Sequence, residues 1–216
     1  MPNYQLNADI SAADLATIHA AGQSIVLLKL TGSGTPLSWV AFTPMEGNSV
    51  QWVESYALYA STSEVTSGTT ITMMSQTAAS PQQNYPLTAA GAFGPPVQDT
   101  TIGVDTYESV NNFAAFPLMS FGLAQGVQVN GTAFPYQPIN AQAVPLNQTV
   151  TFAPLTEVVI FLETNITSGM VITEVLSNST TLTFGNGIND ITVAYESGTF
   201  VQTGSSVIAA KKARAA

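Results

Sequence analysis

Apolar and polar residues alternate with a period of two along most of this chain, which predicts β-strands with one buried face. The clearest case is 50–59, where one face collects Val50, Trp52, Glu54, Tyr56 and Leu58. Similar segments recur about every ten residues and end at Gly, Asn or Pro, as β-strands do. We expect strands at 25–30, 37–43, 69–75, 149–152, 157–163, 170–176, 180–184, 190–195 and 199–202.

One segment near the start follows a helical period instead. Ser11 stands three residues before Asp14, which is the spacing of a capping box, and Ile10 can act as its hydrophobic staple. Gly22 occupies a typical position just past a helix end. The pattern predicts one short N-terminal helix of about ten residues.

Many short strands with almost no helix between them indicate an all-β fold rather than a parallel α/β sheet. We expect an antiparallel β-sandwich of the jelly-roll or immunoglobulin-like type, formed by a single β-rich domain over 1–216. Residues 78–148 hold eight of the 12 prolines. Because proline cannot donate a hydrogen bond to a central ladder, this region is predicted to consist of long loops and edge strands.

An internal similarity suggests a different division of the chain. The segment 65–72, VTSGTTIT, resembles 166–173, ITSGMVIT, and an apolar segment precedes each copy. A true duplication would make 1–100 and 101–210 two similar β modules, followed by a basic tail at 211–216. Shared turn chemistry in a chain rich in Ser and Thr is the alternative explanation.

The charged residues are few and unevenly placed. Only 8% of the chain is charged, and of its four basic residues Lys29 is the only one before the C-terminal Lys211, Lys212 and Arg214. One basic and 13 acidic residues give 1–210 a formal charge of −12. Such a surface repels phosphate groups, so nucleic acid is excluded as a partner and phosphorylated ligands are disfavoured.

The composition also limits compartment and redox chemistry. The chain has no cysteine, which removes disulfides, thiolate chemistry and iron–sulfur ligation. Its N-terminus lacks a basic region followed by an apolar one, and no apolar run approaches the roughly 20 residues of a membrane-spanning helix. We expect no transmembrane segment, and a protein that is cytoplasmic or released without a conventional signal peptide.

Catalytic chemistry finds little support in these residues. His19 is the only histidine, and it lies on the predicted helix. A carboxylate pair could hydrolyse glycosides, with Glu54 between aromatic residues and either Glu163 or Glu174 as candidates. We expect no catalytic residue and no enzyme, and keep glycoside hydrolase as the third hypothesis.

Calcium is an alternative ligand, because it binds oxygen atoms of Asp, Glu and Asn. Two clusters offer such atoms, and they comprise Asp99, Asp105 and Glu108, and Asn186, Asn189 and Asp190. Neither has the spacing of a known calcium loop, and turn chemistry accounts for both. We therefore expect no cofactor and no metal site.

Three groups of residues are candidates for binding. An aromatic strand pair with one acid suits the apolar faces of sugar rings, and it comprises Trp39, Trp52, Glu54, Tyr56 and Tyr59. An apolar stretch in the proline-rich region is either a buried strand pair or an interface patch, and it contains Phe113, Phe116 and Phe121. The basic tail could dock on an acidic neighbouring subunit, through Lys211, Lys212 and Arg214.

These observations favour a non-enzymatic binding protein. The first hypothesis is a lectin-like or toxin-like β-sandwich that recognises carbohydrate or a cell surface through a surface rich in hydroxyl and amide groups. The second is a self-assembling structural protein, such as a filament or shell subunit. We expect a homo-oligomer whose partner is a glycan, a cell surface or another copy of the chain.

Overall fold

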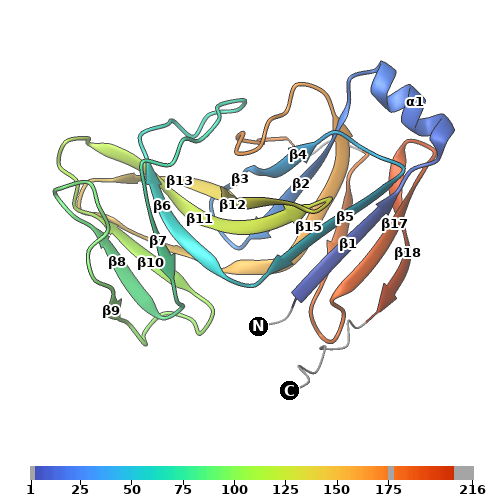
Figure 1. Ribbon diagram of the computed structural model, residues 1–216. Coiled ribbons are helices and arrows are strands. Elements are labelled where there is room, and N and C mark those ends of the chain that lie inside the picture. The colour runs from blue at the N-terminus through green and yellow to red at the C-terminus, as the bar shows by residue number, and fades with distance from the viewer. Residues whose placement is uncertain (1–2, 175–177, 207–216) are drawn as a thin grey trace.

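The computed structural model describes residues 3–174 and 178–206 and confirms an all-β, sandwich-like fold with one short helix. The sheets curl into a half-barrel, and the helix α1 (Ala12–Ala20) lies at one end of it (Figure 1). The basic tail residues Lys211, Lys212 and Arg214 lie outside the described residues.

Within the described residues, the largest sheet has ten strands. Its main path is β18-β17-β1-β5-β11-β13-β3, with β6 and β12 also paired to β11, and β7 paired to β6. The strands are β1 (Asn3–Asp9), β3 (Thr35–Pro36), β5 (Gly47–Val53), β6 (Tyr56–Ser61), β7 (Ser75–Ala79), β11 (Leu118–Val129), β12 (Thr132–Pro138), β13 (Asn140–Pro145), β17 (Asp190–Glu196) and β18 (Thr199–Ser206).

Two four-stranded sheets complete the described part of the chain. One has the order β16-β15-β2-β4, formed by β2 (Ser24–Thr31), β4 (Ser38–Phe42), β15 (Pro154–Glu163) and β16 (Thr180–Thr183). The other has the order β14-β10-β8-β9, formed by β8 (Gln83–Leu87), β9 (Val97–Gln98), β10 (Tyr107–Asn111) and β14 (Thr149–Phe152). Most pairs are antiparallel, but β1 with β17 and β8 with β10 are parallel.

The helix forms as its capping residues predict. The Ser11 hydroxyl accepts a hydrogen bond from the Asp14 backbone N–H at 3.1 Å. Gly22 follows the helix with φ +66°, a left-handed conformation that glycine adopts without strain. No helix among the described residues combines the length and the apolar character needed to cross a bilayer.

Three strand predictions were wrong in their bounds. The segment 50–59 is two strands, because the chain turns at Glu54 and Ser55, where the Ser55 N–H donates to the Val53 carbonyl at 2.8 Å. Over 69–75 the chain forms one bridge at Thr70 before β7 begins at Ser75. The predicted strand 170–176 forms only bridges at 170 and 171, and residues 175–177 lie outside the described residues.

The prediction of loops and edge strands for 78–148 was also wrong at its centre. This region contains the 12-residue β11, which lies inside the large sheet between β5 and β6 on one side and β12 and β13 on the other. Pro135 and Pro138 lie in β12, which pairs only with β11 within the described residues. The other edge of β12 has no neighbouring strand there, so the missing N–H groups of these prolines break no hydrogen bonds on that edge.

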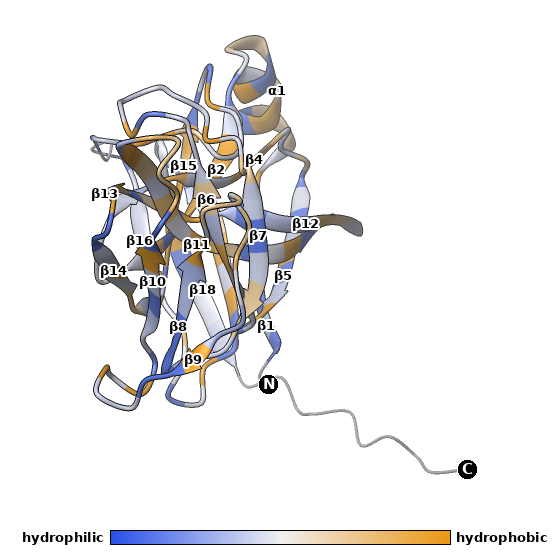
Figure 2. Cartoon of the chain, turned by 90° about the vertical axis from the view of Figure 1, so that its left-hand side faces the viewer, coloured by the Kyte–Doolittle hydropathy of each residue, from blue (hydrophilic) through white to orange (hydrophobic). Residues whose placement is uncertain are grey.

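A tight hairpin connects β11 to β12. Its two loop residues, Asn130 and Gly131, have φ angles of 48° and 82°. Two consecutive positive φ values match the right-handed twist of the flanking strands, and Asn-Gly is the preferred pair for such a turn. Figure 2 shows β12 extending outward at one side of the molecule.

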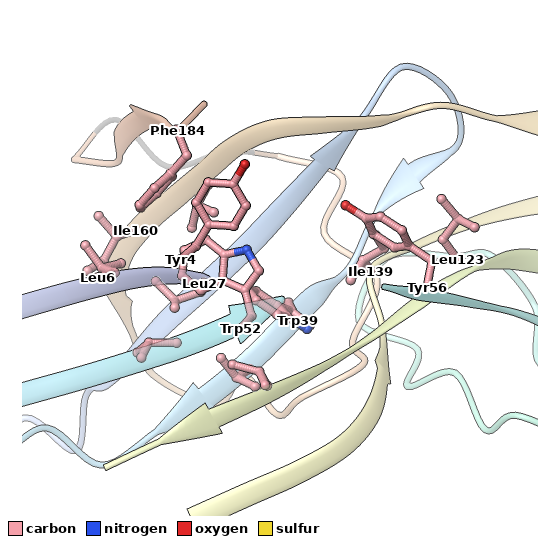
Figure 3. Close-up of a cluster of buried hydrophobic side chains, with 14 of the residues drawn as sticks. Tyr4, Leu6, Leu27, Trp39, Trp52, Tyr56, Leu123, Ile139, Ile160 and Phe184 are labelled. Atoms are coloured by element: carbon pink, nitrogen blue, oxygen red, sulfur yellow. The ribbon is translucent and has the colours of Figure 1, made fainter. Parts of the chain in front are cut away.

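The main core lies between the large sheet and the β2–β15 sheet. Leu6, Trp52 and Phe121 from the large sheet join Leu27 and Ile160 from the opposite one, all with no more than 4% exposure. Figure 3 shows Tyr4, Trp52 and Phe184 packed together, with Tyr56 and Leu123 at the other end of the same cluster.

The two similar segments lie side by side. The Ile71 N–H donates to the Gly169 carbonyl at 2.9 Å, and the Val171 N–H donates to the Thr69 carbonyl at 2.8 Å. Gly68 and Gly169, at matching positions, have nearly equal φ angles of 80° and 81°. Both segments therefore form the same local turn, and the division into two similar modules stays a prediction.

Candidate functional site

A groove opens where both neighbours of β11 bulge away from it. Between the pairs Gln51–Gln128 and Tyr56–Gln125, the four residues 52–55 face only 126 and 127. On the other side, 135 and 136 face Gly126 alone. Because bulges interrupt pairing and redirect side chains, they often lie beside functional sites.

We call this hollow the bulge groove. It has a volume of about 770 Å³, within the range of small-molecule sites. Its lining residues share one property, the absence of charge, and they are Asn3, Tyr4, Gln5, Gln51, Trp52, Val53, Ser55, Gly126, Val127, Gln128, Ala133, Phe134, Pro135 and Tyr136. Aromatic rings and amide side chains therefore line the same hollow.

The amides of the groove come from adjacent strands in one row. Gln5, Gln51 and Gln128 are direct cross-strand neighbours on β1, β5 and β11. The Gln51 Nε2 donates to the Gln5 Oε1 at 3.2 Å, which orients both side chains. A carboxamide both donates and accepts hydrogen bonds, so this row offers both functions to a ligand.

A buried polar cluster lies behind the groove. The Lys29 Nζ donates to the Glu54 Oε1 at 3.0 Å, and the Lys29 side chain is fully buried whereas that of Glu54 is 20% exposed. The Tyr56 hydroxyl donates to the other carboxylate oxygen, Oε2. The Lys29 Nζ also lies 5.7 Å from the centroid of the Trp52 ring, within range of a cation–π interaction.

Burial determines the proton equilibria of this cluster. It lowers the pKa of Lys29, against the opposing effect of the Glu54 charge and hydrogen bond. Burial, followed by the negative charge of Glu54, raises the pKa of Tyr56 and of Tyr4, and it raises that of Tyr107 to about 12. Low dielectric and one carboxylate therefore keep these hydroxyl groups protonated.

Two buried polar atoms near the groove, the Trp52 Nε1 and the Gln125 Oε1, have no hydrogen-bond partner among the residues that the structure describes. The other polar groups of Gln125 are bonded. Its side-chain Nε2 donates to the Val53 carbonyl at 2.8 Å, and its backbone carbonyl accepts from the Trp39 Nε1 at 3.1 Å. Unsatisfied buried groups are uncommon in folded proteins, and here both belong to the residues around the bulges.

The structure brings Trp52 together with Trp39 by ring contact and Glu54 together with Tyr56 by a hydrogen bond, places Tyr59 in a separate core cluster, and buries all four aromatic rings. Trp39, Tyr56 and Tyr59 are at most 3% exposed, and Trp52, at 4%, is the member of this set that lines the groove. The Tyr59 hydroxyl donates to the Asn140 carbonyl at 2.5 Å inside the core. Whether any of these residues contacts a ligand stays a prediction.

The predicted apolar patch divides into buried and exposed residues. Phe121 is completely buried within β11, Phe113 is half-buried against the main core, and Phe116 is 42% exposed. The rings of Phe113 and Phe116 are in contact, with centroids 5.8 Å apart.

The remaining candidates lie apart from the groove. The exposed His19 places its Nε2 2.9 Å from the Pro44 carbonyl oxygen. Asp99 accepts two hydrogen bonds from Thr101, which lower the pKa of Asp99, and Glu108 accepts one from Asn84.

The two acidic residues considered for glycoside hydrolysis, Glu163 and Glu174, line a separate hollow of about 450 Å³. Among the described residues, no cluster of three or more His, Asp or Glu side chains is arranged to hold a metal ion.

Sequence reasoning missed most residues of the groove. The strand signal of β1 was present in the alternation of Asn3, Gln5 and Asn7 with buried Tyr4 and Leu6. The Asn130-Gly131 pair, flanked by alternating residues, is the strongest local signal of a hairpin and would have revealed β12. The bulges themselves depend on contacts between distant strands, which have no local signal.

No family model, curated protein or solved structure matches this chain.

Proposed function

We propose that this protein binds neutral carbohydrate in the bulge groove. The observation that carries the proposal is the combination of aromatic rings and amide side chains in one uncharged hollow, which Phe134 and Tyr136 line together with Gln51 and Gln128. Aromatic rings present flat apolar surfaces with polar edges, which suit the faces of sugar rings. Amides supply the donors and acceptors that hydroxyl groups require.

The charge distribution supports a neutral ligand. No cationic side chain lines the groove, and Lys29, the only Lys or Arg among the described residues, is buried and paired with Glu54. An anionic sugar would meet an acidic surface without a compensating cation. Glycoside hydrolysis needs two carboxyl groups at the scissile bond, and the groove is lined by none, so the proposal is binding without turnover.

A glycan array that includes neutral and acidic glycans tests this proposal, followed by calorimetric titration of each neutral glycan that binds. We expect binding to neutral glycans only. Selective binding of sulfated or sialylated glycans, or no binding at all, would contradict the proposal.

Variants of the groove locate the site. We expect Gln51→Ala and Tyr136→Ala each to weaken binding about tenfold, the factor that corresponds to about 1.4 kcal/mol. Gln202→Ala is the matched control, because Gln202 is an exposed amide on the edge strand β18 and does not line the groove. Equal losses in Gln51→Ala and Gln202→Ala would place the ligand elsewhere.

A further inference from the structure

The wall of the bulge groove includes a corner in the chain. Val53 and Ser55 line the groove, while Glu54 between them directs its carboxylate to Lys29 and Tyr56. One backbone hydrogen bond closes the corner, from the Ser55 N–H to the Val53 carbonyl at 2.8 Å. The Gln125 Nε2 donates to the same Val53 carbonyl at 2.8 Å, so the corner is held on its Val53 side by Gln125 and at its centre by the partners of the Glu54 side chain.

Lys29 holds Glu54 from the opposite sheet. It lies on β2, opposite Val158 of β15, on the face that also carries the core residues Ile25 and Leu27. The ion pair therefore joins the β2–β15 sheet to the β5–β6 corner of the large sheet, across the core. It is the only ion pair between side chains within 3–174 and 178–206.

The ion pair between Lys29 and Glu54 is expected to add little to the net stability of the fold. Removing two charges from water costs about as much as their attraction returns, and apolar replacements of both partners are often neutral or stabilising. This acidic chain has a single Lys or Arg within 1–210, and its charge is buried where it adds nothing to the surface. A buried pair of this kind is better suited to fixing one geometry than to stabilising the fold.

We propose that Lys29 is a positioning residue for carbohydrate binding, a step that rests on the function proposed above. By holding Glu54, Lys29 fixes the corner and with it the placement of Val53, Ser55 and Trp52 along the groove. Lys29 itself does not line the groove and acts through Glu54.

Two variants separate positioning from stability. Lys29→Met leaves Glu54 without its cation. The double variant Lys29→Met with Glu54→Gln removes both charges but keeps an acceptor for the Tyr56 hydroxyl. Ser109→Ala is the control, because it removes the buried hydrogen bond from Ser109 to the Tyr85 carbonyl, at 2.8 Å, on a sheet that does not line the groove. The readouts are the thermal midpoint, glycan affinity and hydrogen exchange of the Ser55 amide.

We expect Lys29→Met to lose thermal stability, Ser55 protection and at least tenfold in affinity. The double variant regains the thermal midpoint, but its affinity stays at least tenfold low and its Ser55 amide still exchanges fast. Ser109→Ala loses stability with affinity unchanged. Recovery of affinity and protection together with stability in the double variant would overturn the proposal.

The exchange measurement needs no ligand. If the wild-type protein binds no glycan, the function proposed above fails, while the Ser55 amide still reports whether Lys29 fixes the corner. Unchanged protection of that amide in Lys29→Met would overturn the positioning role by itself.

Discussion

The strand β11 carries two glycines four residues apart, and their surroundings are opposite. A Cβ built on Gly122 would lie 2.0 Å from the Asn140 carbonyl oxygen and 2.8 Å from the Tyr59 hydroxyl oxygen. A Cβ on Gly126 would meet nothing closer than the Phe134 carbonyl oxygen at 3.8 Å. One strand therefore has a closed half around Gly122 and an open half around Gly126.

The difference arises from the neighbours of each half. Around Gly122, β6 pairs in regular register on one side, β13 approaches closely on the other, and the buried Asn140 donates and accepts hydrogen bonds there. Around Gly126, both neighbouring strands bulge away. The comparison teaches that the same residue type serves close packing in one half of the strand and an open groove in the other.

The largest expected effect comes from closing the gap at Gly122. Gly122→Ala forces the methyl group into the Asn140 carbonyl, so the Tyr59 and Asn140 hydrogen bonds must break or β13 must move. We expect a loss of about 4 kcal/mol or more in the free energy of unfolding, beyond ordinary overpacking. Denaturant unfolding measures this loss. A decrease in the free energy of unfolding below about 1 kcal/mol would show that the closed half is not tightly packed.

The next effect tests the support of the open half. Lys29→Met leaves the Glu54 carboxylate partly buried and unpaired, which typically costs 3 to 5 kcal/mol for fully buried pairs. Because Glu54 is 20% exposed, we expect about 3 kcal/mol, measured by thermal or denaturant unfolding. A change near zero would show that water solvates Glu54 well without its partner.

High pH should destabilise both halves through buried tyrosines. Burial raises the pKa of Tyr56, Tyr59 and Tyr107 above the ordinary 10.0, so above pH 10 the folded chain retains protons that the unfolded chain loses. Stability therefore falls as pH rises above 10. The lowered pKa of Lys29 acts in the opposite direction, but its contribution is complete once the pH exceeds the ordinary value of 10.5.

Unfolding curves recorded from pH 9 to 12, together with tyrosinate absorbance, measure this loss. We expect Tyr56 and Tyr59 to ionise only as the chain unfolds. Ionisation of all seven tyrosines near pH 10, with no change in stability, would contradict the expected loss of stability above pH 10.

The smallest effect on stability is expected at Gly126. Gly126→Ala has room for its methyl group, and Gly126 does not have a positive φ, so we expect a change within about 1 kcal/mol. The methyl group would narrow the groove and lower glycan affinity about tenfold. Gly204→Ala is the matched control, since its Cβ would lie 3.9 Å from Thr192 on a strand outside the groove, and it should leave affinity unchanged.

Local signals in the sequence were sufficient for much of the fold. The Ser11 cap and Gly22 define α1, because both act through backbone bonds within a few residues. Alternation also placed Trp52, Glu54 and Tyr56 on one face, and in the structure Trp52 and Glu54 contact Lys29 while Tyr56 bonds to Glu54. The break of this segment at Ser55 was not predictable, since it depends on β11 pairing with two successive strands.

The site was mostly beyond reach of sequence patterns. The groove combines β1, β5, β11 and β12. Its amides resemble ordinary surface positions, and its aromatic residues, which are buried or half-buried, resemble ordinary core positions. Trp39 and Tyr59 have the same aromatic pattern as Trp52, but tertiary packing makes the first two fully buried. Periodicity identifies which face of a strand is buried, but it does not show where neighbouring strands separate and leave a groove.

The burial of Lys29 also determines how readily a protease specific for Lys and Arg cleaves the described part of the chain. An enzyme that cleaves after Lys or Arg finds, among the described residues, only this one position, in the middle of β2 and completely covered. Cleavage there requires β2 to leave the core, so its rate follows the opening of the core rather than fraying at loops or termini. A single buried lysine thus makes trypsin a reporter of core opening for the whole described part of the molecule.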